Sequence, residues 1–83
     1  MPTVARKLAD ILTHTLGVEP EELRPDVTMA ALELDSLALA ELGAAVHDQF
    51  GVKVAGEQVG KASTFAEVVA AVEGQMAAVA GGN

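Results

Sequence analysis

Cysteine, tryptophan and tyrosine are all absent from this 83-residue chain, and two phenylalanines are its only aromatic residues. Without cysteine the chain can form neither a disulfide bond nor a thiolate metal site. Basic residues are also scarce, since 5 Lys and Arg stand against 12 Asp and Glu, for a net charge of −7. The charge and the lack of base-stacking side chains argue against a nucleic-acid partner and favour partners with basic surfaces.

Apolar runs of the length that a membrane-spanning helix needs, about 18–20 residues, are absent too. Near the start, Arg6, Lys7 and Asp10 interrupt any apolar core of a signal peptide. We therefore expect no membrane partner and a cytoplasmic location. A chain of this length is expected to form one domain that buries roughly 60% of its unfolded surface and folds without disulfides or metals.

Three segments carry apolar residues at the spacing of a helix that packs on one side. They span residues 3–16, 36–50 and 64–76. Gly17 and Gly51 follow the first two segments, where a glycine commonly ends a helix. The sequence therefore predicts three long helices, each with one apolar face.

The third of these helices has a clear beginning and an indistinct end. Thr64 and Glu67 have the spacing of a capping box, in which each side chain accepts a hydrogen bond from the other residue's backbone amide. The apolar stripe that follows consists of Phe65, Val68, Val69, Val72 and Met76. Residues 77–83 are small and glycine-rich, so we expect a domain over residues 1–76 and a flexible C-terminal tail.

A long connection separates the first two helices and contains Pro20 and Pro25. Loops of this length are usually functional or contain a short helical turn, which we expect at residues 21–23. Isolated apolar side chains should hold the loop against the core, because its backbone would otherwise remain disordered. These side chains are Val18, Leu23, Val27, Leu32 and Leu34.

The second connection, after Gly51, is expected to begin as an extended segment. Residues 52–54 alternate as in a strand, but the sequence offers no partner strand. A short helix is predicted over Glu57–Lys61, with Val59 facing the core. The predicted fold is therefore all-α: a four-helix antiparallel bundle of three long helices and one short helix, with a long loop between the first and second helices.

The second long helix starts at an Asp-Ser-Leu sequence, residues 35–37, in which Asp35 and Ser36 are both suitable N-caps. On a helical wheel, one side of this helix carries Leu39, Leu42, Val46 and Phe50. The opposite side carries Leu37, Glu41, Ala44 and Asp48. Leu37 therefore either packs under the preceding loop or lies exposed beside the serine.

Neither catalysis nor metal binding is supported by the histidines. A nucleophilic serine needs a base within hydrogen-bond reach, whereas His47 lies about 16 Å along the helix axis from Ser36. His14 belongs to another helix, and no Gly-x-Ser-x-Gly motif surrounds Ser36. The histidines lack His-x-x-x-His spacing, and no acidic run matches a calcium loop. We expect no catalytic residues, no metal site and no enzymatic activity.

Three features together resemble the acyl carrier proteins of fatty acid or polyketide synthesis. They are the Asp-Ser-Leu motif at residues 35–37, the Glu-Leu pair at 41–42 and the sequence Phe-Gly-Val-Lys-Val at 50–54. The resemblance reaches from about residue 4 to residue 72 and implies the same four-helix fold. It also implies that Ser36 carries a 4′-phosphopantetheine arm through a phosphodiester, with an acyl group held as a thioester at the far end.

The resemblance further implies that partner enzymes recognise the second helix. The expected partners are a phosphopantetheinyl transferase, a ketosynthase, an acyltransferase and tailoring enzymes with basic docking patches, and the free protein is expected to be a monomer. The residues assigned to partner recognition are Asp35, Leu37, Ala40, Glu41, Ala44 and Asp48. Scattered acids are usually ordinary solvated surface; in the functional interpretation, Asp35, Glu41 and Asp48 steer docking.

The chain also departs from the family pattern. Glu33 and Ala55 stand where family members commonly have glycine and proline, and Ala38 and His47 stand in place of further acids. The sequence Asp-Ser-Leu-Ala-Leu is closer to discrete polyketide carriers, so we predict a free-standing carrier of polyketide or fatty acid synthesis. Two alternatives stay open: an aminoacyl or peptidyl carrier of non-ribosomal peptide synthesis, and a helical interaction module whose serine is unmodified.

Overall fold

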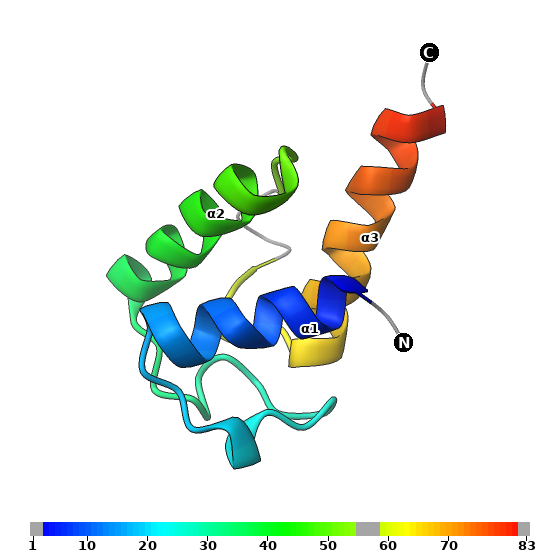
Figure 1. The fold of residues 1–83 in the computed structure, drawn as a ribbon. Coiled ribbons are helices and arrows are strands. Elements are labelled where there is room, and N and C mark those ends of the chain that lie inside the picture. Colours follow the sequence, from blue (N-terminus) through cyan, green and yellow to red (C-terminus); the bar gives the residue numbers. More distant parts are fainter. Residues whose placement is uncertain (1–2, 55–58, 82–83) are drawn as a thin grey trace.

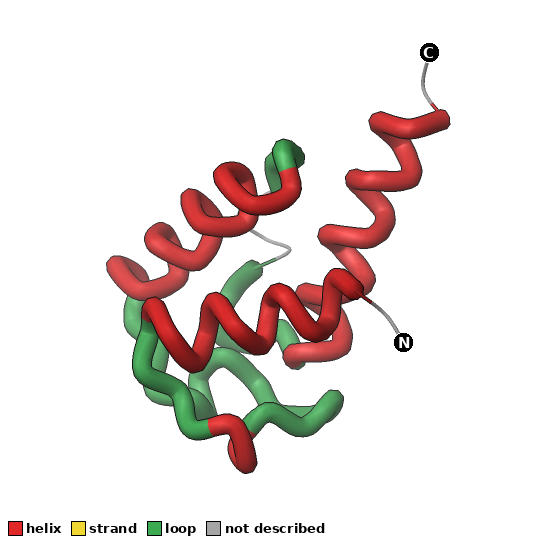
Figure 2. The backbone as a smooth tube through the Cα atoms, in the orientation of Figure 1, coloured by secondary structure: helices red, strands yellow, loops and turns green. Residues whose placement is uncertain are grey.

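The computed structural model describes residues 3–54 and 59–81, and every regular element in these ranges is helical (Figure 1, Figure 2). The elements are α1 (Thr3–Asp10), the π-helical η1 (Ile11–Thr15), the 3-10 helix η2 (Pro20–Glu22), α2 (Ser36–Phe50) and α3 (Phe65–Gly81). The predicted all-α class is confirmed. Within the same ranges no helix combines the length and hydrophobicity needed to cross a bilayer.

The predicted first helix is present as α1 continued by η1. Leu8, Ile11 and Leu12 are buried and form its core face. Gly17 follows with a φ of 74°, and the amide of Val18 donates to the carbonyl of Leu12 at 2.9 Å. Glycine adopts this left-handed conformation without a steric cost, so the predicted C-terminal stop is confirmed.

Helix α2 begins and ends at the predicted residues. Gly51, with a φ of 72°, ends it, and its amide donates to the carbonyl of His47 at 2.9 Å. Leu42 and Val46 are fully buried, which confirms the core side of the helical wheel. The half-buried residues of the same side are Leu39 and Phe50. In Figure 1, α1 and α2 run in opposite directions.

The long loop between η1 and α2 places its apolar side chains in or against the core. The five predicted anchors are all buried or half-buried: Val18, Leu23, Val27, Leu32 and Leu34. Met29 is fully buried as well, although no pattern in the sequence distinguishes it. The predicted turn after Pro20 is present as η2. The loop is therefore a packed part of the domain.

The middle of this loop also pairs with the segment that leads into α3. The amides of Met29 and Ala30 donate to the carbonyls of Ser63 and Lys61, both at 2.9 Å. An isolated antiparallel bridge joins the same two segments. These backbone hydrogen bonds connect parts of the chain that lie far apart in the sequence. They hold the loop that precedes α2 against the segment that precedes α3.

The predicted fourth, short helix over Glu57–Lys61 is not confirmed. Its first two residues lie outside the described ranges, and residues 59–61 form a bend and the start of a turn, not a helix. Gly60 lies within this stretch and disfavours helix. Val59 is nevertheless buried, as predicted. Residues 52–54 form neither a helix nor a strand, in line with the expectation of a connecting segment.

Helix α3 begins with the predicted capping box. The amide of Thr64 donates to Glu67 Oε1 at 2.9 Å, and the amide of Glu67 donates to Thr64 Oγ1 at 3.1 Å. The helix continues to Gly81, past the end near Met76 that the sequence predicts, because alanine favours helix even without packing. Among the described side chains none after Val72 is buried. Figure 1 shows this end of α3 projecting from the body of the molecule.

Glu33, in the turn before α2, is the only non-glycine residue with a positive φ, 62°, within the described ranges. Its amide donates to the carbonyl of Ala30 at 2.9 Å, and the amide of Leu34 donates to the carbonyl of Met29 at 3.2 Å. A side chain with a Cβ costs roughly 1–2 kcal/mol in this left-handed conformation. The departure from glycine at this position therefore leaves strain in the turn that leads into α2.

Replacing Glu33 with glycine should relieve that strain. We expect Glu33→Gly to raise the free energy of unfolding by about 0.5–1 kcal/mol, because the steric relief exceeds the added entropy of the unfolded chain. Urea denaturation followed by circular dichroism measures the change. Glu33→Ala is the matched control, since it removes the carboxylate but keeps the Cβ. A glycine variant no more stable than the alanine variant would contradict the assignment of strain.

Candidate functional site at the start of α2

The residue that caps α2 is Asp35 and not Ser36. The Asp35 backbone is extended, and its Oδ1 accepts a hydrogen bond from the amide of Ala38 at 2.8 Å. Ser36 is the first residue of the helix itself and is exposed. Since the neighbouring carboxylate satisfies the amide in the first turn, the Ser36 hydroxyl is left at the surface without a capping role.

Every residue assigned to partner recognition is exposed on α2 or at its start: Asp35, Leu37, Ala40, Glu41, Ala44 and Asp48. Leu37 has 70% of its surface exposed, so the alternative in which it packs under the preceding loop is wrong. Leu37 is thus a large apolar side chain that is exposed next to an exposed serine. The four of these residues that the helical wheel places opposite the core side are therefore all exposed on α2: Leu37, Glu41, Ala44 and Asp48.

The two histidines are not bonded to the serine among the described residues. Both are exposed, and in the described part of the chain neither forms a hydrogen bond with Ser36. His47 lies in the last turn of α2, at the opposite end of the helix from the serine. Among the described residues no group of three or more His, Cys, Asp and Glu side chains could hold a metal ion.

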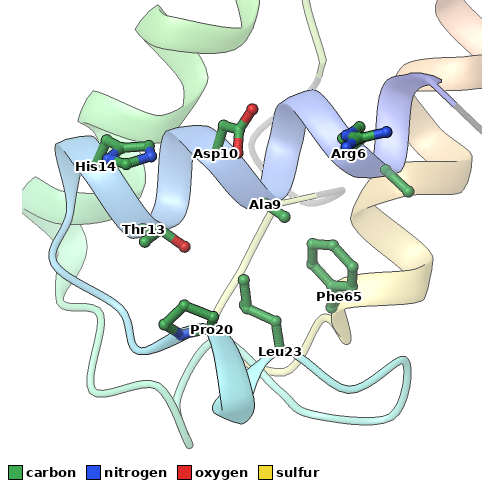
Figure 3. A pocket seen from close by; sticks show the side chains of 9 residues that line it. Arg6, Ala9, Asp10, Thr13, His14, Pro20, Leu23 and Phe65 are labelled. Carbon is green, nitrogen blue, oxygen red and sulfur yellow. The ribbon is translucent and has the colours of Figure 1, made fainter.

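A groove of about 590 Å³ runs between α1, η2 and the start of α3 (Figure 3). Leu23 and Phe65 point from its floor towards α1, as Figure 3 shows. The ionisable side chains that line it are Arg6, Asp10 and His14. The candidate serine does not line this groove, so the groove is separate from the start of α2.

A smaller groove of about 250 Å³ lies directly before the serine. Its lining residues are Ala30, Glu33, Leu34, Asp35 and Lys61. Lys61 belongs to the segment before α3. Its carbonyl accepts a hydrogen bond from the Ala30 amide, which holds this segment beside the groove. Sequence reasoning missed Lys61, because the contact depends on two loops meeting and no local pattern signals it.

The whole region from α1 to the buried part of α3 matches one family model. Residues 6–72 match the family described as "Phosphopantetheine attachment site". Members of this family of carrier proteins hold a covalently bound 4′-phosphopantetheine prosthetic group. The start of α2 fits such a group, because an exposed serine hydroxyl that is not needed as a helix cap can accept a phosphodiester linkage without loss of a structural hydrogen bond.

Curated relatives support the same assignment. The meromycolate extension acyl carrier protein of Mycolicibacterium aurum is 33% identical over 67 residues, which are 80% of this chain and 69% of that protein. An acyl carrier protein of Rhodococcus erythropolis is 30% identical over 71 residues, 84% of this chain and 78% of that protein. Clavatol synthase claF of Penicillium crustosum is 30% identical over 71 residues, 86% of this chain and 3% of the synthase. The chain therefore belongs to the phosphopantetheine-attachment family and, within it, to the acyl carrier proteins.

Proposed function

We propose that this protein holds acyl or ketide intermediates as thioesters on a 4′-phosphopantetheine arm attached to Ser36, and passes them between the enzymes of a synthase. The observation that supports the attachment site most is the exposed Ser36 hydroxyl at the first residue of α2, next to the Asp35 cap. In this role the chain is a substrate for enzymes and not an enzyme itself.

The position of Ser36 suits the charge of a phosphodiester. Unpaired backbone amides and the helix macrodipole favour a negative charge at a helix N-terminus by about 0.3–1 kcal/mol. The Asp35 carboxylate stabilises the first turn by accepting a hydrogen bond from the Ala38 amide, and the neighbouring Ser36 is exposed. When attached, the prosthetic group supplies a thiol on a flexible arm, which is the group that carries the acyl cargo.

Modification should depend on Ser36 alone. We expect the purified protein, incubated with coenzyme A and a broad-specificity phosphopantetheinyl transferase, to gain the mass of one phosphopantetheine, and Ser36→Ala to gain none. Intact-mass spectrometry measures the adduct. Ser63→Ala, which replaces the only other serine of the chain, is the control and should still be modified. An adduct on Ser36→Ala would refute the site, and unimpaired function of that variant in the producing cell would favour the interaction-module alternative.

Partner enzymes are proposed to dock on the exposed surface of α2. Leu37 supplies an apolar contact beside the attachment site, and the carboxylates of Glu41 and Asp48 lie further along the helix. Complementary charge speeds encounter more than it strengthens the final complex, which suits a carrier that must leave each enzyme again. The proposed partners are the phosphopantetheinyl transferase, a ketosynthase, an acyltransferase and tailoring enzymes with basic docking patches.

Two substitutions on this surface should weaken docking in different ways. We expect Leu37→Ala to lower kcat/KM for modification by the transferase about tenfold, because a desolvated apolar contact is lost. Glu41→Gln should lower it about two- to fivefold and reduce its dependence on salt, as loss of a steering charge does. Glu73→Gln, an exposed acid on α3, is the matched control and should change neither quantity. Equal effects of Glu41→Gln and Glu73→Gln would argue against α2 as the docking surface.

The cargo is proposed to be a ketide or fatty acyl group. The run Asp-Ser-Leu-Ala-Leu and the replacement of acids by Ala38 and His47 favour a polyketide carrier, whereas the meromycolate extension relatives favour a fatty acid carrier. The acids Asp35 and Glu41 beside the serine disfavour the aminoacyl or peptidyl carrier, whose members usually have glycine or histidine before the serine.

Loading assays on the modified protein distinguish these cargoes. We expect mass spectrometry to detect a malonyl thioester after incubation with malonyl-coenzyme A and a malonyl transferase, and no aminoacyl thioester after incubation with adenylation domains. Elongation should then proceed faster with a polyketide ketosynthase than with a fatty acid ketosynthase. The reverse order of the two ketosynthases would assign the protein to fatty acid synthesis, and aminoacyl loading alone would assign it to peptide synthesis.

A further inference from the structure

The small groove before Ser36 has an unusual distribution of charge. Glu33 and Asp35 line it with carboxylates, and Lys61 is the only cation among its lining residues. The Asp35 carboxylate is already engaged as the cap of α2, through its bond with the amide of Ala38. The charged groups of this groove are therefore two carboxylates and one ammonium group, and Asp35 directly precedes the serine proposed for modification.

Lys61 is held at this groove by the backbone. Its carbonyl accepts from the amide of Ala30 at 2.9 Å, and two residues later the carbonyl of Ser63 accepts from the amide of Met29 at the same distance. Met29 is fully buried, so the pairing is anchored in the core. The position of the Lys61 backbone relative to the start of α2 is consequently fixed, while its side chain is exposed and able to move.

A phosphodiester on Ser36 would add a negative charge next to two carboxylates. Of the side chains that line the groove, only Lys61 can offset that charge. Among the described residues, the Lys61 ammonium group forms no ion pair with Glu33 or Asp35, so no such contact has to be broken. A compact lysine ammonium on a flexible stem is well suited to a single phosphate at the surface.

We propose that, in the modified protein, the Lys61 ammonium group pairs with the phosphodiester on Ser36 and directs the first part of the arm across the groove formed with Ala30 and Leu34. The inference rests on the proposed attachment at Ser36. Lys61 acts as a positioning residue: it biases the direction in which the arm leaves the protein, and exposure to solvent keeps the pairing weak enough for partner enzymes to displace it.

Amine reactivity tests this pairing without any enzyme turnover. The unmodified and fully modified proteins are treated with a small excess of acetic anhydride, and acetylation of each lysine is followed by peptide mass spectrometry. We expect Lys61 to react about two- to fivefold more slowly in the modified protein, because pairing with phosphate holds the group as the ammonium ion, which is not a nucleophile. This difference should disappear at high salt. Lys53, an exposed lysine outside the groove, is the internal control and should react equally in both forms.

Phosphorus NMR provides an independent measurement on the same samples. In the modified protein we expect Lys61→Gln to move the phosphodiester resonance and Lys53→Gln to leave it in place. Glutamine at position 61 keeps the backbone bond to Ala30, so folding is preserved, and circular dichroism verifies it.

The attachment at Ser36 and the pairing with Lys61 are refuted by different results. A chain that gains no phosphopantetheine by mass refutes the attachment and, with it, the pairing. A normally modified protein in which Lys61 reacts at the same rate in both forms, or in which Lys61→Gln and Lys53→Gln affect the phosphorus resonance alike, refutes the pairing alone.

Discussion

The site depends on how firmly the loop before α2 is attached to the core. Met29, Leu32 and Leu34 are buried within six residues of one another, and the backbone between them turns through the strained conformation at Glu33. Burial of such side chains contributes roughly 1.5–3 kcal/mol each, which exceeds the cost of one left-handed residue. This balance explains how the turn tolerates Glu33 and still delivers Asp35 in an extended conformation, ready to cap the helix. Leu42 and Val46 hold the helix itself in the core, and the loop anchors hold the turn that brings Asp35 to its start.

Asp35 caps α2, so the neighbouring Ser36 is not needed as the cap. Aspartate and serine are both good N-caps, and the sequence alone does not decide between them. In the structure the carboxylate bonds the Ala38 amide, which keeps the Ser36 hydroxyl outside the helical hydrogen-bond network. The same arrangement leaves Leu37 exposed, so an apolar side chain and an exposed hydroxyl stand next to each other in the sequence at the start of α2. Chemical modification of the serine therefore need not disturb the helix on which it is carried.

The parts of the fold that the sequence predicts well are those with local causes. The bounds of α2 follow from Asp35 and Gly51, and the start of α3 follows from the Thr64–Glu67 capping box, whose two hydrogen bonds involve only neighbouring residues. The helical wheel places Leu37 opposite the core side of α2 but leaves open whether the preceding loop covers it, and the structure shows that it is exposed. The parts that the sequence did not predict have distant causes: the burial of Met29 and the approach of Lys61 to the start of α2 both require pairing between loops more than thirty residues apart. A single sequence without periodicity in those loops contains no signal for that pairing.

The last turns of α3 are a suitable place to attach a linker, a dye or a solid support. No described side chain after Val72 is buried, and Figure 1 shows the stretch leading away from the other helices. A linker, a dye or a solid support fused there would share no packing with the turn that holds Ser36. We therefore expect the start of α2 to keep the same structure in a free and in a tethered form of the protein.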